Sequence, residues 1–210
     1  LNEYQELMGE LPQIHCNHAS NRDNIYWGSD RLSSMLCRFA YKTATFGKDR
    51  RFEGANEASP FFWGDLLQKN IPYVRNLVFP TINLLRVNPT LPYQDPTKPF
   101  VSHWFSSSEG ANVQSFCDMI SEENQDLLEA ENGVCIMYTH FADGFVEAGQ
   151  LNEQFRRQMR RLSAKNGWFV PVGELLDYLR GRREDCTISK KELRTMELAW
   201  LKFKLLRGSS

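Results

Sequence analysis

The sequence has 210 residues, with 25 Lys and Arg against 26 Asp and Glu, and a formal net charge of −1 at pH 7. This balance argues against a nucleic-acid-binding protein, which normally carries a basic excess. No apolar run approaches the roughly 20 residues that a membrane-spanning helix needs. The length allows one large domain or two small ones, and with 41% hydrophobic residues it is ample for a real core. The composition predicts a globular protein with no transmembrane span and no nucleic-acid partner.

The cysteines are five in number and form no Cys-x-x-Cys pair: Cys16, Cys37, Cys117, Cys135 and Cys186. Their spacing argues against a zinc ribbon, and the length of the chain argues against a disulfide scaffold. Buried thiols in a reducing compartment are the simpler interpretation, and they favour a cytoplasmic location.

The first half of the chain reads as short helices, polar loops and one strand. A short helix is expected within residues 1–11, followed by an extended segment that ends near His18 and a polar loop over residues 19–28. Ser29 or Asp30 can cap the next helix, whose apolar residues follow the 3.6-residue period at Leu32, Met35, Leu36 and Phe39. Another helix is expected from Ser59-Pro60 onward, and a strand within residues 78–87, with its strongest signal over 82–87.

The second half alternates strands and helices. We expect strands over residues 100–105, 134–138 and 168–172, and helices over 110–132 (divided at Ser121), 151–164 and 173–179. Ser189 and Glu192 form a capping-box pattern that opens a last helix, ending near Leu206. The alternation favours an α/β fold with parallel strands.

Three histidines stand where strands are expected to end, which is where function gathers in parallel α/β folds. His140 follows the clearest strand, and its imidazole can act as ligand, acid or base. His15 and His18 are three residues apart, so they would point to opposite faces of one strand unless it ends between them. His18 is nearer the polar loop and is the better candidate for a site residue. For all three, packing against a loop is the competing interpretation.

Aromatic and charged residues in the expected loops suit a sugar ligand, because C–H faces stack on aromatic rings while hydroxyls bond polar groups. The candidate substrate-binding residues are Tyr26, Trp27, Arg51, Trp63 and Asp65. Core packing for the aromatic residues and solvated loop charges for Arg51 and Asp65 are the alternatives.

The segments GVCIMYTHFADGF and LNEQFRRQMRRLSAKNGWFVPVGELLDYL resemble the last part of a polysaccharide deacetylase, over residues 133–179. The resemblance implies a distorted or partial (β/α) barrel over residues 1–180, followed by a basic linker and helix over 181–210. It also implies metal-dependent removal of acetyl groups from glycans. His140 matches the family's general acid, and His15 and His18 match its metal histidines. The implied cofactor is a divalent metal, with zinc preferred.

Two departures from the family pattern keep other functions open. The histidine motif is His-Cys-Asn-His, one residue shorter than the family's, and the sequence contains no Asp-Asp pair to supply the family's base. A non-catalytic glycan-binding or scaffold protein of the same fold is therefore an alternative, and an unrelated α/β domain is another. The last helix is apolar on two sides, which predicts contact with a second subunit or with an upstream part of the same protein; adsorption to an anionic membrane is a weaker alternative.

Overall fold

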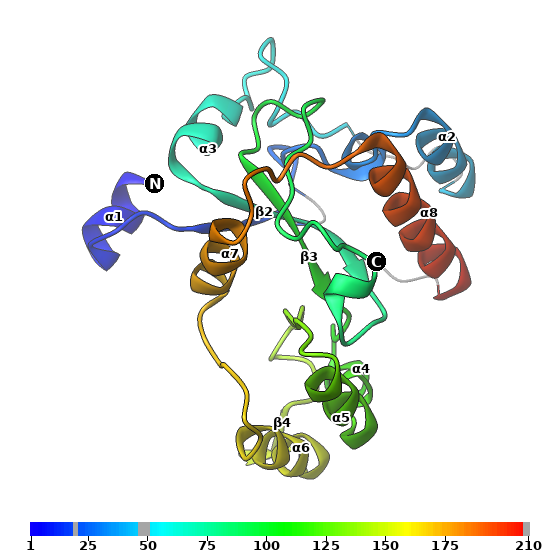
Figure 1. Ribbon diagram of the computed structural model, residues 1–210. Coiled ribbons are helices and arrows are strands. Elements are labelled where there is room, and N and C mark those ends of the chain that lie inside the picture. The colour runs from blue at the N-terminus through cyan, green and yellow to red at the C-terminus, as the bar shows by residue number, and fades with distance from the viewer. Residues whose placement is uncertain (19–20, 46–50, 208–210) are drawn as a thin grey trace. The chain divides into compact units, whose positions relative to one another are not determined.

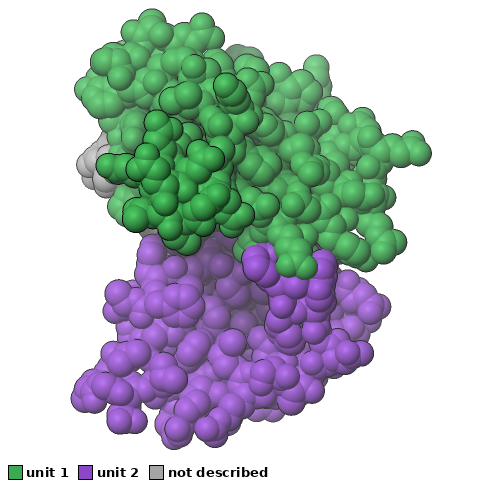
Figure 2. Space-filling view, turned by 90° about the vertical axis from the view of Figure 1, so that its left-hand side faces the viewer, with its two compact units in different colours: residues 1–76, 90–105, 172–210 green, residues 77–89, 106–171 purple. Residues whose placement is uncertain are grey.

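The computed structural model describes residues 1–18, 21–45 and 51–207. The chain divides into two compact units, each built from segments far apart in the sequence (Figure 2). Unit 1 comprises Leu1–Asn76, Thr90–Phe105 and Val172–Ser210, and unit 2 comprises Leu77–Pro89 and Ser106–Pro171. Residues 181–210, which the sequence sets apart as a linker and helix, belong to unit 1.

The sheet has the order β1 (Ile14–Cys16), β2 (Tyr73–Phe79), β3 (His103–Ser108). β1 pairs with β2 in parallel. The backbone N–H of His103 donates to the carbonyl of Pro72, and that of Glu109 donates to the carbonyl of Phe79, so β3 also runs parallel to β2. These observations confirm a mixed α/β fold with parallel strands. The sheet has three strands within the described residues, and its closure into a barrel stays a prediction.

β2 is apolar on both faces, as a covered parallel strand should be. Its side chains at Tyr73, Val74, Leu77 and Phe79 are at most 1% exposed. Such burial removes nearly all of their apolar surface from water, which contributes about 1.5–3 kcal/mol to the stability of the fold for each large side chain.

Unit 1 surrounds its strands with helices (Figure 1): α1 (Asn2–Met8), α2 (Met35–Ala44), α3 (Gly64–Asn70), α7 (Val172–Gly181) and α8 (Lys190–Arg207). A short 3-10 helix, Gly28–Arg31, precedes α2. α2 and α8 lie side by side, with the ring of Tyr41 stacked on that of Trp200 at a centroid distance of 5.8 Å.

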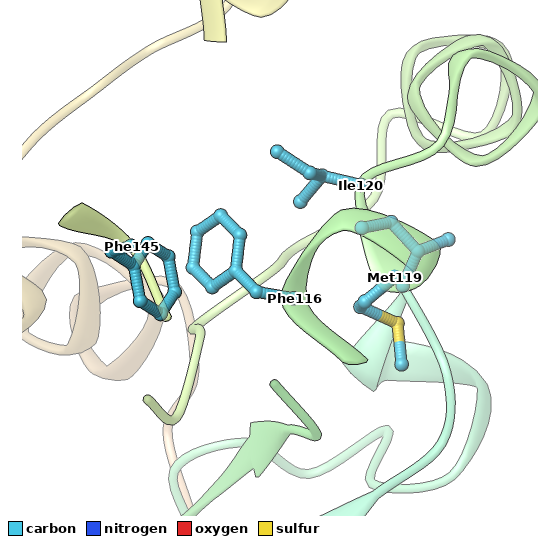
Figure 3. Packing of buried hydrophobic residues seen from close by; sticks show 5 residues of the cluster. Phe116, Met119, Ile120 and Phe145 are labelled. Carbon is cyan, nitrogen blue, oxygen red and sulfur yellow. The ribbon is translucent and has the colours of Figure 1, made fainter. Parts of the chain in front are cut away.

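Unit 2 contains α4 (Val113–Met119), α5 (Glu122–Ala130), α6 (Glu153–Ser163), a 3-10 helix at Leu84–Arg86 and a hairpin of β4 (Val146–Glu147) and β5 (Gln150–Leu151). Its core gathers Ile82, Phe116, Met119, Ile120 and Phe145. Figure 3 shows the rings of Phe116 and Phe145 facing one another, and their centroids lie 5.4 Å apart in an edge-to-face arrangement. This geometry suits the aromatic quadrupole.

Two helix starts predicted from capping residues are confirmed. Ser121 accepts the N–H of Asn124 and divides α4 from α5. At α8, Ser189 Oγ accepts the N–H of Glu192, and Glu192 Oε2 accepts the N–H of Ser189 in return. These contacts satisfy donors that a helix start leaves unpaired.

Three expected strands differ from the structure for local reasons. Residues 84–86 form a 3-10 turn because Asn83 Oδ1 accepts the N–H of Leu85. The segment 134–138 makes a single bridge, between Met137 and Ser108, since β3 ends at Ser108. The segment 168–171 has no regular structure; Pro171 lacks a backbone donor and disfavours regular backbone before it.

Two expected helices begin later than the pattern suggests. Residues 57–61 form turns in which Ser59 Oγ accepts the N–H of Phe61, and α3 starts only at Gly64. The helix expected from Ser29 becomes a 3-10 helix and then α2. Its periodic apolar residues differ in burial: Leu32 is buried, whereas Met35, Leu36 and Phe39 are 84%, 55% and 69% exposed.

Within the part of the chain that the structure describes, no helix combines the length and the apolar character that crossing a bilayer demands.

Candidate functional site

Unit 1 contains a cavity of about 760 Å³ beside the end of β1. Its volume falls in the range typical of small-molecule sites. The lining combines an imidazole, two carboxylates, an indole and three carboxamides with aliphatic side chains: Leu1, Asn2, Glu3, Gln5, Leu11, His15, Asp23, Trp63, Leu66 and Asn70. Two residues singled out in the sequence, His15 and Trp63, therefore line one pocket.

His15 lies in β1, half-buried against the edge of an aromatic ring. Its imidazole meets the indole of Trp63 at a centroid distance of 5.0 Å and an interplanar angle of 75°. Burial lowers the pKa of His15, and this effect outweighs the opposing influences of Asn17 and Asp23. The neutral imidazole is therefore favoured near pH 7, and one of its ring nitrogens carries a free lone pair.

Asn17 determines which nitrogen that is. Its side chain is 5% exposed and makes two hydrogen bonds with Ile25: Oδ1 accepts the backbone N–H, and Nδ2 donates to the carbonyl, both at 2.9 Å. This pairing fixes the orientation of the amide, so Oδ1 is an acceptor toward His15 Nε2, 3.1 Å away. His15 must then donate from Nε2, which leaves Nδ1 as the acceptor of the neutral ring.

The loop that carries Asp23 is held against the segment before α3. Trp63 Nε1 donates to the carbonyl of Asp23 at 2.6 Å, and the backbone N–H of Trp63 donates to the carbonyl of Gly54. A Cβ on Gly54 would lie 2.0 Å from the carbonyl oxygen of Asp23, so only glycine fits this close approach. The sequence contains both Asp23 and Asn17, but their place in the site depends on contacts that local patterns do not reveal.

The other candidate substrate-binding residues of unit 1 lie outside the lining of this pocket. Tyr26 stacks on Phe100 at a centroid distance of 6.4 Å, and the guanidinium of Arg31 covers Trp27 at 3.5 Å. Arg51 and Asp65 are exposed. Asp65 Oδ1 accepts the N–H of Leu66 in the first turn of α3, which accounts for its position at a helix start.

His18 lies beyond the end of β1, so the strand does end between the two histidines of the motif. Its side chain is exposed, and its backbone N–H and carbonyl bond the side chain of Asn24. This arrangement closes the start of the polar loop. His15, rather than His18, lines the pocket.

His140 belongs to unit 2, where it is exposed after the bridge at Met137. Its Nε2 lies 3.1 Å from the hydroxyl of Tyr138, and its carbonyl accepts the N–H of Asp143. Asp143 thus contacts the backbone of His140, and the partner of the ring is Tyr138.

The fit of a divalent metal to these residues is incomplete. His15 and the carboxylates of Glu3 and Asp23 are ligands of the right chemistry in one pocket, and catalytic zinc sites use three protein ligands held together around the ion. Across residues 1–18, 21–45 and 51–207 no group of three His, Cys, Asp or Glu side chains is placed to hold an ion. We therefore derive no chemical step through a metal.

Comparison of the chain with protein-family models, with curated proteins and with solved structures gives no significant match.

Proposed function

We propose that this chain is a polysaccharide deacetylase-like hydrolase whose pocket around His15 binds acetylated glycans. The observation that carries the proposal is the combination of His15, Asp23 and Trp63 in the lining of one cavity. The resemblance of residues 133–179 to the last part of polysaccharide deacetylases supports the same substrate class.

The lining suits a sugar ring. An indole offers a flat apolar face for the C–H groups of a pyranose, and the amides of Asn2, Gln5 and Asn70 can exchange hydrogen bonds with hydroxyl and acetamido groups. Asp23 adds an acceptor for hydroxyl donors. Such a mixture of one aromatic face and several polar groups is typical of sites that orient a small polar ligand.

Hydrolysis of an acetyl group requires water to bond to the carbonyl carbon while the bond to nitrogen or oxygen breaks. The leaving atom takes a proton, a role that the resemblance implies for His140, which lies in unit 2, whereas the pocket belongs to unit 1. His15, with Nδ1 as a free acceptor, can accept a hydrogen bond from water or from the ligand in the pocket.

A non-catalytic glycan-binding protein of the same architecture is the second candidate. Two observations favour it: the sequence has no Asp-Asp pair, and among the described residues no three His, Cys, Asp or Glu side chains are grouped so that they could hold an ion. Without a base, a deacetylase should lose about 10²–10⁴ in rate. On this second candidate, the purified chain binds acetylated glycans without ordinary turnover.

Binding and turnover are measured separately. Isothermal titration with acetylated chito- and xylo-oligosaccharides should show binding that Trp63→Ala weakens at least about tenfold, whereas Trp168→Ala, at an exposed tryptophan of unit 2, leaves it unchanged. Acetate release is assayed with added zinc, cobalt or manganese. Turnover at ordinary rates would identify a complete hydrolase. Absence of binding to every acetylated oligosaccharide, or equal effects of the two substitutions, would overturn the proposal.

A further inference from the structure

α1 is an exposed helix at the N-terminal end of the described residues. It has seven residues and buries none of them. Its apolar side chains follow helical spacing at Tyr4, Leu7 and Met8 and are 42%, 84% and 63% exposed. Isolated helices of this length are marginal in water, so α1 needs a surface that covers its apolar stripe. Glu3 and Glu6 are three residues apart in α1, so they lie on one side of the helix and make it acidic.

The pair formed by α2 and α8 also exposes apolar side chains, but its charge is positive. α2 turns Met35, Leu36 and Phe39 to solvent, and α8 leaves Leu198 and Leu205 43% and 58% exposed. Within each helix these residues share one face, since Met35 and Phe39 are four apart and Leu198 and Leu205 are seven apart. An exposed apolar surface of this kind on two adjacent helices marks an interaction site.

The same two helices concentrate positive charge. Up to Leu206, the two helices carry two acidic residues and seven basic ones, which are Arg38, Lys42, Lys190, Lys191, Arg194, Lys202 and Lys204. Both acidic side chains are engaged, Glu192 with Ser189 and Glu197 with the backbone of Ser33 and Ser34. The whole chain has a net charge of −1, so the remainder of the molecule is acidic.

The two surfaces cannot meet within one molecule. α1 and the α2–α8 pair stand at opposite sides of unit 1 (Figure 1). We propose that α1 of one copy docks on the α2–α8 surface of a second copy, head to tail. Apolar side chains meet apolar side chains, and the glutamates of α1 face the lysines and arginines beside them. In this proposal, the exposed apolar side of α8 contacts α1 of a second copy, which is the second subunit that the sequence of the last helix predicts.

The size of the contact sets the expected affinity. A seven-residue helix on two helices gives an interface at the small end of specific complexes, where association is weak and transient. Its charge component weakens as salt screens the pairs. Because the contact is heterologous, it leaves one free surface at each end, and association should extend beyond dimers as concentration rises.

The test uses the intact chain in sedimentation velocity from about 10 μM to 1 mM, a span that covers weak association. We expect the average mass to rise with concentration at low salt and to rise less in high salt. Leu7→Lys and Phe39→Asp, both at exposed positions, should each leave the chain monomeric. Mixed in equal amounts they should form a 1:1 dimer that grows no further, because one intact surface remains on each. Leu151→Lys and Phe169→Asp, at exposed positions of unit 2, serve as controls that retain association.

Other outcomes overturn the proposal. A monomer at every concentration contradicts it, and so does association that survives both substitutions. Failure of the mixed variants to pair would show that the contact is not head to tail. Binding of the chain to vesicles of phosphatidylcholine and phosphatidylserine through Phe39, without self-association, would assign the surface to an anionic membrane instead.

Discussion

Asn17 holds the ring of His15 through a single oxygen, Oδ1, which lies 3.1 Å from Nε2 and also accepts the N–H of Ile25. One buried amide thus sets both the start of the polar loop and the tautomer of the imidazole in the pocket. The backbone of Ile25, eight residues after Asn17, therefore determines which ring nitrogen of His15 keeps a free lone pair.

The tautomer can be observed directly. In long-range ¹H–¹⁵N spectra at neutral pH, His15 should show a protonated Nε2 and an unprotonated Nδ1. Asn17→Ala removes the acceptor, so the two tautomers should then approach a mixture. His18, whose side chain is exposed, is the internal reference and should not respond. A protonated Nδ1 in the unmodified chain would contradict the assigned tautomer.

Asn17→Ala should also destabilise the chain. The substitution leaves the buried N–H and carbonyl of Ile25 without their partners, which costs about 1–3 kcal/mol for each unsatisfied group. Urea unfolding measures the loss. A value near zero would mean that water or another side chain replaces the amide.

Glu197 supports α2 from the far end of the sequence. Its two carboxylate oxygens accept the N–H groups of Ser33 and Ser34, at 2.5 and 3.0 Å, and it is 1% exposed. Glu197→Gln replaces one acceptor by a donor that faces a backbone N–H. We expect a loss of about 1–3 kcal/mol in unfolding free energy, compared with almost none for Glu174→Gln at an exposed position of α7.

The same residue predicts a pH dependence. Burial raises the pKa of Glu197 above its ordinary value of 4.5, more than the serine N–H groups lower it. The folded state therefore binds more protons than the unfolded state between the two pKa values, and the stability of the chain falls as pH rises through that window. Glutamine does not titrate. The difference in unfolding free energy between the unmodified chain and Glu197→Gln should therefore narrow from pH 4.5 toward pH 7. A constant difference would contradict the raised pKa.

Gly54 is predicted to be intolerant of a side chain. Gly54→Ala places a Cβ 2.0 Å from the carbonyl of Asp23, so the loop must move, at a cost of about 1–3 kcal/mol. The hydrogen bond from Trp63 Nε1 to that carbonyl should weaken as well, which a shift in tryptophan emission would report. Gly181→Ala, where the added Cβ meets no atom within 4 Å, should leave stability unchanged or raise it by up to about 1 kcal/mol.

The core of unit 2 gives a test of packing. Phe145 is 1% exposed and contacts the rings of Phe116, Phe141 and Phe155. Phe145→Ala should cost about 3–5 kcal/mol and remove amide-exchange protection from α4 and α6. Phe141→Ala, in the same cluster but 64% exposed, should cost much less. Equal losses would mean that the cluster does not pack as described.

Local signals in the sequence determined much of the helical structure. Ser121 divides α4 from α5, and the reciprocal contacts of Ser189 and Glu192 open α8, because a cap satisfies backbone donors with a side chain only three residues away. The parallel α/β class also followed from the order of elements. The periodicity of apolar residues does not reveal competing contacts between a side chain and the nearby backbone. Asn83 forms a 3-10 turn and Ser59 forms a turn in this way, and each interrupts an apolar pattern typical of regular structure.

Tertiary structure alone decided burial and the composition of the pocket. The period of α2 groups Met35, Leu36 and Phe39 on one face, but periodicity does not say whether another element covers that face, and in the structure it is exposed. Glu197 is buried where two backbone N–H groups, 163 and 164 residues away in the chain, need an acceptor. His15, Asp23 and Trp63 share a cavity because β1, the polar loop and the segment before α3 are brought together by long-range hydrogen bonds. Those contacts join residues distant in the chain, so no local pattern in the sequence encodes them.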